Sequence, residues 1–302
     1  MIYLIIAIIC SAMFSVTFKL CRRKDSDAGR VILINYLTAF LFFLIPILTN
    51  VAAGVPVSDY RLGVSTTLLT IPMGILFMLG FIVMDWSTGH NGVALTTTAA
   101  RAALIIPVVL CFLFLSQPEP SWIGVILILG AMALIVLPTE KNGSSGQSGK
   151  AGAAAIIALI AVFFAYGISD FMLKVVQKAV ADANAGNPEI MNRQLSMLTC
   201  SIFFMSALSS LVTCLINGSF KKNPFNWSNL SGGVKLGLFN CGCTWGILKA
   251  LGEMPTGTFY PLYNIGIVIL ATLIGVIAFK EKLHWRQIAG LALAVLAIVL
   301  VF

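Results

Sequence analysis

The feature that most constrains this chain is its series of long apolar runs. A helix needs about 20 consecutive apolar residues to cross the hydrocarbon core of a bilayer, and windows of this kind follow one another through the whole sequence. Only 10% of the residues are charged, whereas a soluble domain has about 25%. The sequence therefore predicts an all-α, multi-pass integral protein of the cytoplasmic (inner) membrane, with the lipid bilayer as a partner.

Loop signals divide the apolar runs into ten predicted transmembrane helices. These helices are expected at residues 2–20, 31–50, 62–84, 93–115, 121–138, 152–176, 194–217, 232–251, 256–279 and 286–302. The loops are short, and the most linker-like segment is Gly/Ser-rich and lies at 139–151. It separates a first five-helix half, 1–138, from a second, 152–302. Because no segment is long enough for a soluble domain, the function is expected within or across the membrane.

The basic residues predict how the helices are oriented. Of the 19 Lys and Arg residues, 13 fall in one set of alternate loops, five in the other, and Arg101 inside a predicted span. Cytoplasmic loops carry the excess of Lys and Arg, so both termini are expected outside and the loop CRRKDSDAGR inside. The net charge of +8 is explained by these retention charges, and no nucleic-acid partner is expected.

The two halves match weakly along the chain, as an internal repeat would. A shift of 155 residues superposes the first and sixth spans, and a shift of 162 superposes the third and fourth on the eighth and ninth. The matched pairs are Ser11 with Tyr166, Ser15 with Asp170, Lys19 with Lys174, Phe77 with Phe239, Gly80 with Gly242, Thr96 with Thr258, and Glu119 with Glu281. An odd number of helices in each half makes such a repeat inverted in the membrane.

With ten spans in two halves and a Glu before the last helix of each, the chain resembles the drug/metabolite transporter superfamily, in particular its EamA-like branch. The best local match is FKEKLHWRQIAGLALAVLAIVL, at 279–300. The resemblance implies a ten-helix secondary transporter of two inverted repeats that typically exports its substrate. The chain departs from the pattern in FLSQPEPSWIG, which is shortened around Glu119 and carries two prolines. These motifs concern helix ends and do not identify a substrate.

Polar residues in the predicted span 152–176 share one helix face. Tyr166, Asp170 and Lys174 are spaced i, i+4, i+8, and Ser15 holds the position equivalent to Asp170 in the first span. A charge at mid-bilayer costs about 2.5 to 3.5 kcal/mol, so this face must meet protein or water. The face either lines a substrate cavity, or Lys174 extends to the interface and pairs locally with Asp170.

Arg101 is the second charge inside a predicted span. Its repeat partner is Tyr263, and Tyr260, Tyr263 and Asn264 share a helix face in the ninth span. Arg101 is therefore predicted to meet this group at a common centre and to bind substrate, since a guanidinium suits a carboxylate or phosphate. The alternative is a structural arginine that pairs with Asp85 or Glu253.

The predicted span 232–251 contributes two lesser substrate-binding candidates, Asn240 and Trp245. It also has Gly at 233, 237, 242 and 246, a spacing that lets helix backbones approach closely. The seven cysteines lie mostly in apolar runs and are interpreted as small apolar residues. No metal site, cofactor or catalytic residue is predicted.

These features favour a secondary transporter that works by alternating access around a central site between the two repeats. Its substrate is a small metabolite or drug-like solute, and the resemblance implies export. The alternative is sugar or amino-acid uptake by proton symport through Asp170 or Glu253. An intramembrane enzyme or a channel fits least, because catalytic motifs and a filter loop are missing from the sequence. Monomer and homodimer both remain open.

Overall fold

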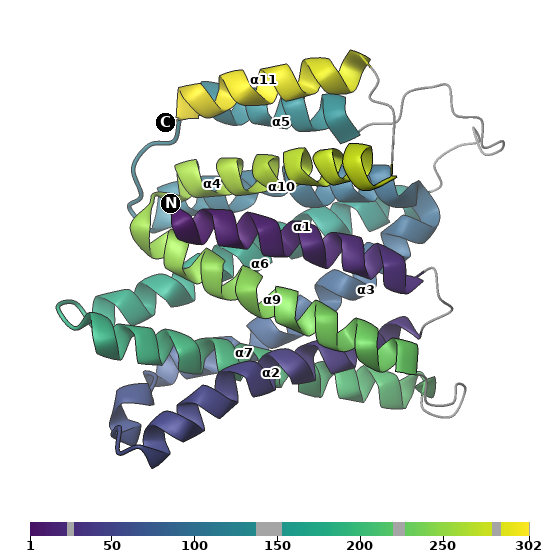
Figure 1. Cartoon of the computed structure of the whole chain (residues 1–302). Coiled ribbons are helices and arrows are strands. Elements are labelled where there is room, and N and C mark those ends of the chain that lie inside the picture. Colours follow the sequence, from purple (N-terminus) through teal and green to yellow (C-terminus); the bar gives the residue numbers. More distant parts are fainter. Residues whose placement is uncertain (23–26, 137–152, 220–226, 280–284, 302) are drawn as a thin grey trace. The chain divides into compact units, whose positions relative to one another are not determined.

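The computed structural model describes residues 1–22, 27–136, 153–219, 227–279 and 285–301. Every regular element in these ranges is a helix and none is a strand (Figure 1). The predicted all-α fold is thus confirmed for the described residues. The predicted linker at 139–151 and Glu281 lie outside them.

Ten α-helices and one 3-10 helix occur in the described ranges. Those of the first predicted half are α1 (Ile2–Arg22), α2 (Ala28–Ala52), η1 (Val57–Tyr60), α3 (Val64–Ala102), α4 (Ile105–Phe114) and α5 (Trp122–Val136). Those of the second are α6 (Ala153–Ala183), α7 (Pro188–Ile216), α9 (Trp227–Glu253), α10 (Thr256–Phe279) and α11 (Trp285–Val301).

The prediction of a loop at residues 85–92, between the third and fourth spans, was wrong. Helix α3 continues through it for a total of 39 residues. Gly89 and the polar residues around it indicated a loop, but their side chains bond without breaking the helix. Thr88 Oγ1 donates to the Met84 carbonyl at 2.7 Å, and Asn91 Nδ2 donates to the Ala155 carbonyl at 2.9 Å. Because residues 85–92 contain no proline, the backbone hydrogen bonds of the helix continue through them.

The helix break lies instead between Ala102 and Ile105. Pro107 explains its position, because a proline has no N–H and its ring clashes with the carbonyl four residues earlier, which here is Ala103. In the first turn of a new helix the missing N–H costs nothing. Arg101, expected early in a fourth span, therefore stands in the last turn of α3.

The chain folds into two compact units that cut across the predicted halves. Unit 1 comprises Met1–Met78 and Met172–Glu253, and unit 2 comprises Leu79–Phe171 and Met254–Phe302. Helices α3 and α6 each begin in one unit and end in the other. Each unit thus draws helices from both predicted halves, and the inverted repeat stays a prediction.

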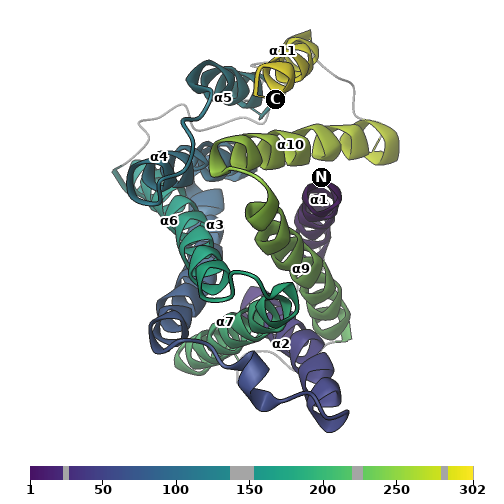
Figure 2. The ribbon, with the colours of Figure 1, turned by 90° about the vertical axis from the view of Figure 1, so that its left-hand side faces the viewer.

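Unit 1 is held together by close helix packing on the glycine face of α9. Helix α9 packs on α1 and α2, and α2 also packs on α7 (Figures 1 and 2). A Cβ atom added at Gly237 would lie 2.7 Å from the Asn35 carbonyl oxygen, and one at Gly246 would lie 2.9 Å from the Tyr3 carbonyl oxygen. The close backbone approach predicted for this glycine spacing is confirmed.

Unit 2 pairs α5 with α11 and packs α10 on α4 and α5 (Figure 2). Gly167 of α6 leaves room for Ile106, since an added Cβ would lie 2.4 Å from the isoleucine Cδ1. Leu104, Ile128 and Met132 form an apolar part of the described core of this unit and are almost fully buried.

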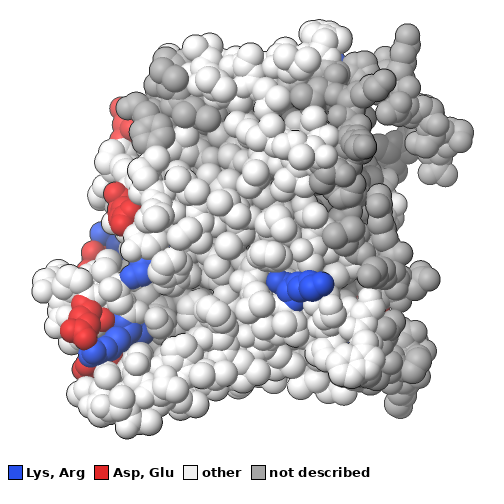
Figure 3. All heavy atoms as spheres, viewed as in Figure 1, with Lys and Arg blue, Asp and Glu red and all other residues white. Residues whose placement is uncertain are grey.

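Five segments of the described helices are long and apolar enough to cross a membrane. They are Gly29–Ala52, Val64–Asn91, Ala153–Ala183, Pro188–Ile216 and Thr256–Ile274. Figure 3 shows that most of the described atoms visible on one face belong to uncharged residues. Several apolar helices of this length are what a multi-pass membrane protein requires.

Candidate functional site

The candidate site is built around Arg101, a half-buried residue in the last turn of α3. Its guanidinium Nη1 donates a hydrogen bond to Oδ1 of Asn264, on α10, at 3.3 Å. Asn264 is held in place by a bond from its Nδ2 to the Tyr260 carbonyl at 3.0 Å. The predicted meeting of Arg101 with the polar face of α10 is therefore present in unit 2.

The polar face of α10 is buried and ordered by aromatic packing. Tyr260, Tyr263 and Asn264 all have side chains that are nearly inaccessible. Phe259 stacks on Tyr263, with ring centroids 5.4 Å apart, and meets Tyr260 edge-on at 5.0 Å. This ring packing fixes Tyr260 and Tyr263 on the helix face that carries Asn264, the partner of Arg101.

Helix α6 joins the group through the backbone of Asp170. The hydroxyl of Tyr260 donates to the Asp170 carbonyl oxygen at 2.5 Å. Because this bond uses the main chain, it leaves the Asp170 carboxyl available for other interactions. The guanidinium of Arg101 is close enough to the Asp170 carboxyl and the Tyr166 hydroxyl for its charge to act on both groups.

Tyr166 lies one turn before Asp170 on α6, at a point where α3 has a glycine. A Cβ atom added to Gly80 would lie 3.9 Å from Cε2 of Tyr166. The structure thus assembles six predicted residues from three helices of unit 2, which we call the Arg101 cluster. Its members are Tyr166 and Asp170 of α6, Arg101 of α3, and Tyr260, Tyr263 and Asn264 of α10.

The Arg101 cluster has the chemistry to bind an anion or a zwitterion. A guanidinium carries five N–H donors, so the bond to Asn264 leaves it further donors for a ligand carboxylate or phosphate. The Asp170 carboxyl adds a group that can pair with a ligand ammonium or hold a proton. The aromatic rings add flat apolar surfaces beside these charges.

The other three predicted site residues lie in unit 1. Ser15 is exposed, and its hydroxyl donates to the Ser11 carbonyl at 3.0 Å. Asn240 Nδ2 donates to Oδ1 of Asn35 at 3.3 Å, and the Trp245 ring meets Tyr3 edge-on at 5.2 Å. A common centre for these residues and the Arg101 cluster stays a prediction.

Lys174 has a different environment from the interfacial one that was one of its two predicted placements. It is buried, and its Nζ donates to the Leu251 carbonyl at 2.5 Å and to Gln177 Oε1 at 3.1 Å. It therefore holds the last turn of α9. Gln177 was missed as a partner, although its i+3 spacing from Lys174 is a readable signal.

One alternative considered for Arg101 was a pairing with Asp85 or Glu253. Glu253 belongs to unit 1, where its carboxylate lies 3.3 Å from the amino group of Met1. The described hydrogen bond of Arg101 goes to a neutral amide instead.

Comparisons with known proteins support the fold more than the function. No protein-family model matches the chain. An uncharacterized protein of Haemophilus influenzae is 28% identical over 296 residues, which cover 94% of this chain and 93% of that protein. A protein of known crystal structure superposes with a TM-score of 0.73 at 12% identity, over 99% of this chain and 94% of that one. At this identity the likeness shows the fold alone.

Proposed function

We propose that this protein is a secondary transporter of the drug/metabolite transporter superfamily. In this proposal it exports a small metabolite or drug-like solute across the cytoplasmic membrane by alternating access. The observation that carries the proposal is the Arg101 cluster, in which α3 meets α10 through Arg101 and Asn264 and α6 meets α10 through Asp170 and Tyr260. All three helices contain segments long and apolar enough to cross a bilayer.

Arg101 and Asp170 place ionisable groups among apolar helices. An arginine or aspartate at the centre of a membrane helix costs about 2.5 to 3.5 kcal/mol. Packing of helices alone needs no such groups, because small residues of the kind found on α9 suffice. Charged groups that converge from separate helices are typical of substrate and ion pathways.

Two helix pairings support the inverted repeat, which is one architecture used for alternating access. In a ten-helix inverted repeat the second and seventh spans are equivalent, as are the fifth and tenth. Helix α2 packs on α7 in unit 1, and α5 packs on α11 in unit 2. Both pairs join equivalent helices, as expected of elements that face each other across a pseudo-twofold axis.

A second support comes from equivalent glycines. Gly80 and Gly242 were matched by the shift of 162, and Ser11 and Tyr166 by the shift of 155. A Cβ added at Gly242 would lie 2.6 Å from Cys10 Sγ, next to Ser11, and one added at Gly80 would approach Tyr166. Each glycine thus faces the first helix of the other predicted repeat, at positions that differ by one residue under the shift of 155.

The substrate class follows from the charges of the Arg101 cluster. Arg101 favours an anionic or zwitterionic solute, and the aromatic residues Tyr166, Tyr260 and Tyr263 favour one with a flat or apolar part. No cofactor or enzymatic role is proposed, since transport by alternating access needs only a site that opens to each side in turn.

The test is to find the substrate and then transport it with purified protein. Cells with and without the protein are compared by metabolite profiling, and the leading differences are assayed in proteoliposomes. Arg101→Ala should abolish transport while membrane insertion and yield stay normal. Arg61→Ala, which changes an exposed arginine in the other unit, is the matched control. Equal transport by Arg101→Ala and the parent protein would refute the proposal.

Proton-driven uptake of a sugar or amino acid is the second candidate function. Asp170 favours it, because its carboxyl lies near the positive charge of Arg101 while Tyr260 bonds to its carbonyl only. In this version a proton neutralises the Asp170 carboxylate, which frees the Arg101 guanidinium for the carboxylate of an amino-acid substrate. An imposed pH gradient in the proteoliposome assay distinguishes coupled uptake from export or exchange.

A further inference from the structure

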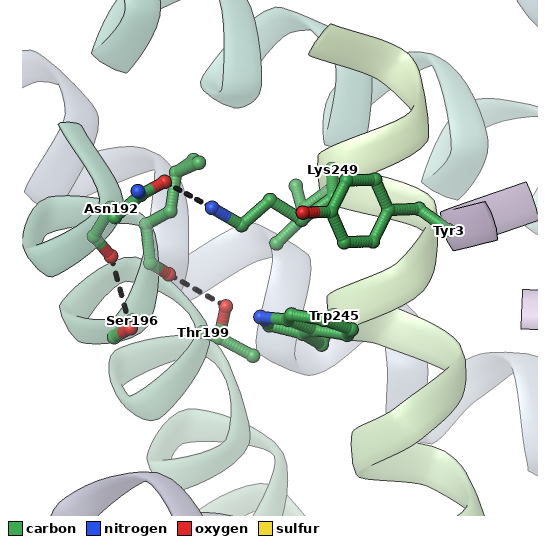
Figure 4. A pocket seen from close by; sticks show the side chains of 8 residues that line it. Tyr3, Asn192, Ser196, Thr199, Trp245 and Lys249 are labelled. Atoms are coloured by element: carbon green, nitrogen blue, oxygen red, sulfur yellow. Dashed lines mark hydrogen bonds between the residues drawn. The ribbon is translucent and has the colours of Figure 1, made fainter. Parts of the chain in front are cut away.

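Unit 1 contains a cavity of about 150 Å³ lined by residues of α1, α7 and α9 (Figure 4). We call it the Lys249 pocket. Its lining residues are Tyr3, Asn192, Leu195, Ser196, Thr199, Trp245, Leu248 and Lys249. Sites for drug-sized ligands start at about 300 Å³, so this pocket suits a much smaller molecule.

The polar side of the pocket carries one cation and no carboxylate among its lining residues. Figure 4 shows Lys249 extending from α9 toward Asn192 of α7, and its Nζ donates to Asn192 Oδ1. An ammonium has three donors, so this bond leaves donors for a ligand. Glu253 lies one helical turn beyond Lys249 and outside the pocket lining, with its carboxylate beside the Met1 amino group.

The hydroxyls of Ser196 and Thr199 are already committed to their own helix. The Ser196 hydroxyl donates to the Asn192 carbonyl at 3.0 Å, and the Thr199 hydroxyl donates to the Leu195 carbonyl at 2.7 Å. Their protons are therefore not offered to a ligand. Lys249 is the charged residue among the lining residues, so it selects the sign of the ligand charge.

The opposite wall of the pocket is apolar and partly aromatic. Trp245 lies one turn before Lys249 on α9 and is 36% exposed, which is high for an indole ring flanked by packed helices. Tyr3 meets it edge-on, with ring planes at 85°. Leu195 and Leu248 complete a surface against which a flat apolar body can pack.

We propose that the Lys249 pocket binds a small organic carboxylate, with the anion on Lys249 and an apolar or aromatic body on Trp245. The site lies wholly in unit 1 and shares no residue with the Arg101 cluster in unit 2. It does not rest on the proposed transport function, because binding is measured on the protein in detergent without a membrane gradient.

The test compares three probes of nearly equal shape on the purified full-length protein. Benzoate is an anion, benzamide is neutral and benzylamine is a cation. Binding is followed by calorimetry and tryptophan fluorescence, with empty micelles as the blank for partitioning into detergent. Benzoate should bind at least about tenfold more tightly than either analogue, because only a carboxylate gains the charge-assisted bond to Lys249.

Variants then locate the site. Lys249→Gln and Trp245→Ala should each weaken benzoate binding about tenfold or more, whereas Lys178→Gln, an exposed lysine on α6, should not. In the Arg101→Ala background, Lys249→Gln should still weaken benzoate binding about tenfold or more, which separates this pocket from the Arg101 cluster. Undiminished binding by a folded Lys249→Gln protein overturns the proposal. If that variant does not fold, equal affinity of the parent for benzoate and benzamide overturns it instead.

Discussion

The guanidinium Nη1 of Arg101 lies 3.3 Å from the amide oxygen Oδ1 of Asn264, which joins the last turn of α3 to α10 within unit 2. The two residues are 163 positions apart in the sequence. Their contact places a permanent cation against a neutral acceptor, so the guanidinium is positioned without being neutralised by that partner.

Arg101→Lys should transport poorly even though the positive charge is kept. A lysine is a single point charge and cannot both reach Asn264 and offer a planar fork to a carboxylate. Loss of one charge-assisted hydrogen bond, about 1.5 to 3 kcal/mol, corresponds to a loss of roughly tenfold to a hundredfold in the transport rate at low substrate. Initial rates in proteoliposomes measure this, and a lysine variant with the parental rate would contradict the predicted fork.

Asp170→Asn tests whether the carboxyl takes part in proton coupling. The substitution keeps the backbone carbonyl that accepts from Tyr260, so the fold of the cluster should persist. If transport is proton-coupled, accumulation driven by a pH gradient should fall to about the level of empty liposomes, while substrate exchange without a gradient continues. Gradient-driven accumulation at the parental level in Asp170→Asn would exclude this carboxyl as the coupling group.

Tyr260→Phe should lower stability without removing any charge. Tyr260 is fully buried, and its hydroxyl makes the bond that links α10 to α6. A hydrogen bond of this kind contributes about 0.5 to 1.5 kcal/mol, so the free energy of unfolding should fall by that amount. Thermal unfolding in detergent measures the change. The nearby Tyr263→Phe is a comparison on the same helix face.

Lys174→Met should destabilise the protein more than Lys178→Met. Lys174 is buried and bonds the Leu251 carbonyl and Gln177, so its loss leaves these acceptors without the ammonium. We expect a cost of about 1.5 to 3 kcal/mol. Lys178 is 39% exposed and pairs with Asp182 at the surface, where such pairs contribute at most about 1 kcal/mol. Equal melting temperatures of the two variants would argue against a role for Lys174 at the end of α9.

Gly237→Ala should separate α2 from α9, whereas Gly89→Ala should be tolerated. An added Cβ at Gly237 would lie 2.5 Å from Thr38 Cβ and 2.7 Å from the Asn35 carbonyl oxygen. At Gly89 nothing lies within 4 Å, and alanine in a helix interior is favoured over glycine by about 0.5 to 1 kcal/mol. Melting temperatures in detergent should therefore move in opposite directions. A stabilised Gly237→Ala protein would show that the helices can part without cost.

The sequence alone determined the helical class, the approximate position of most helices, and which polar residues share a helix face. These properties are local, because apolar run length and a period of 3.6 residues depend only on neighbours along the chain. The spacing of Tyr260, Tyr263 and Asn264 already predicted one polar face of α10. The glycine spacing on α9 likewise predicted its close contacts.

Tertiary structure decided what lies opposite each of these faces. Asn91 of α3 donates to the Ala155 carbonyl, and no local pattern reveals an acceptor 64 residues away. The Lys249 pocket likewise combines Tyr3 of α1 with residues of α7 and α9. Sequence periodicity orients a side chain about its own helix axis, but its partners are chosen by the packing of helices that are distant in the chain.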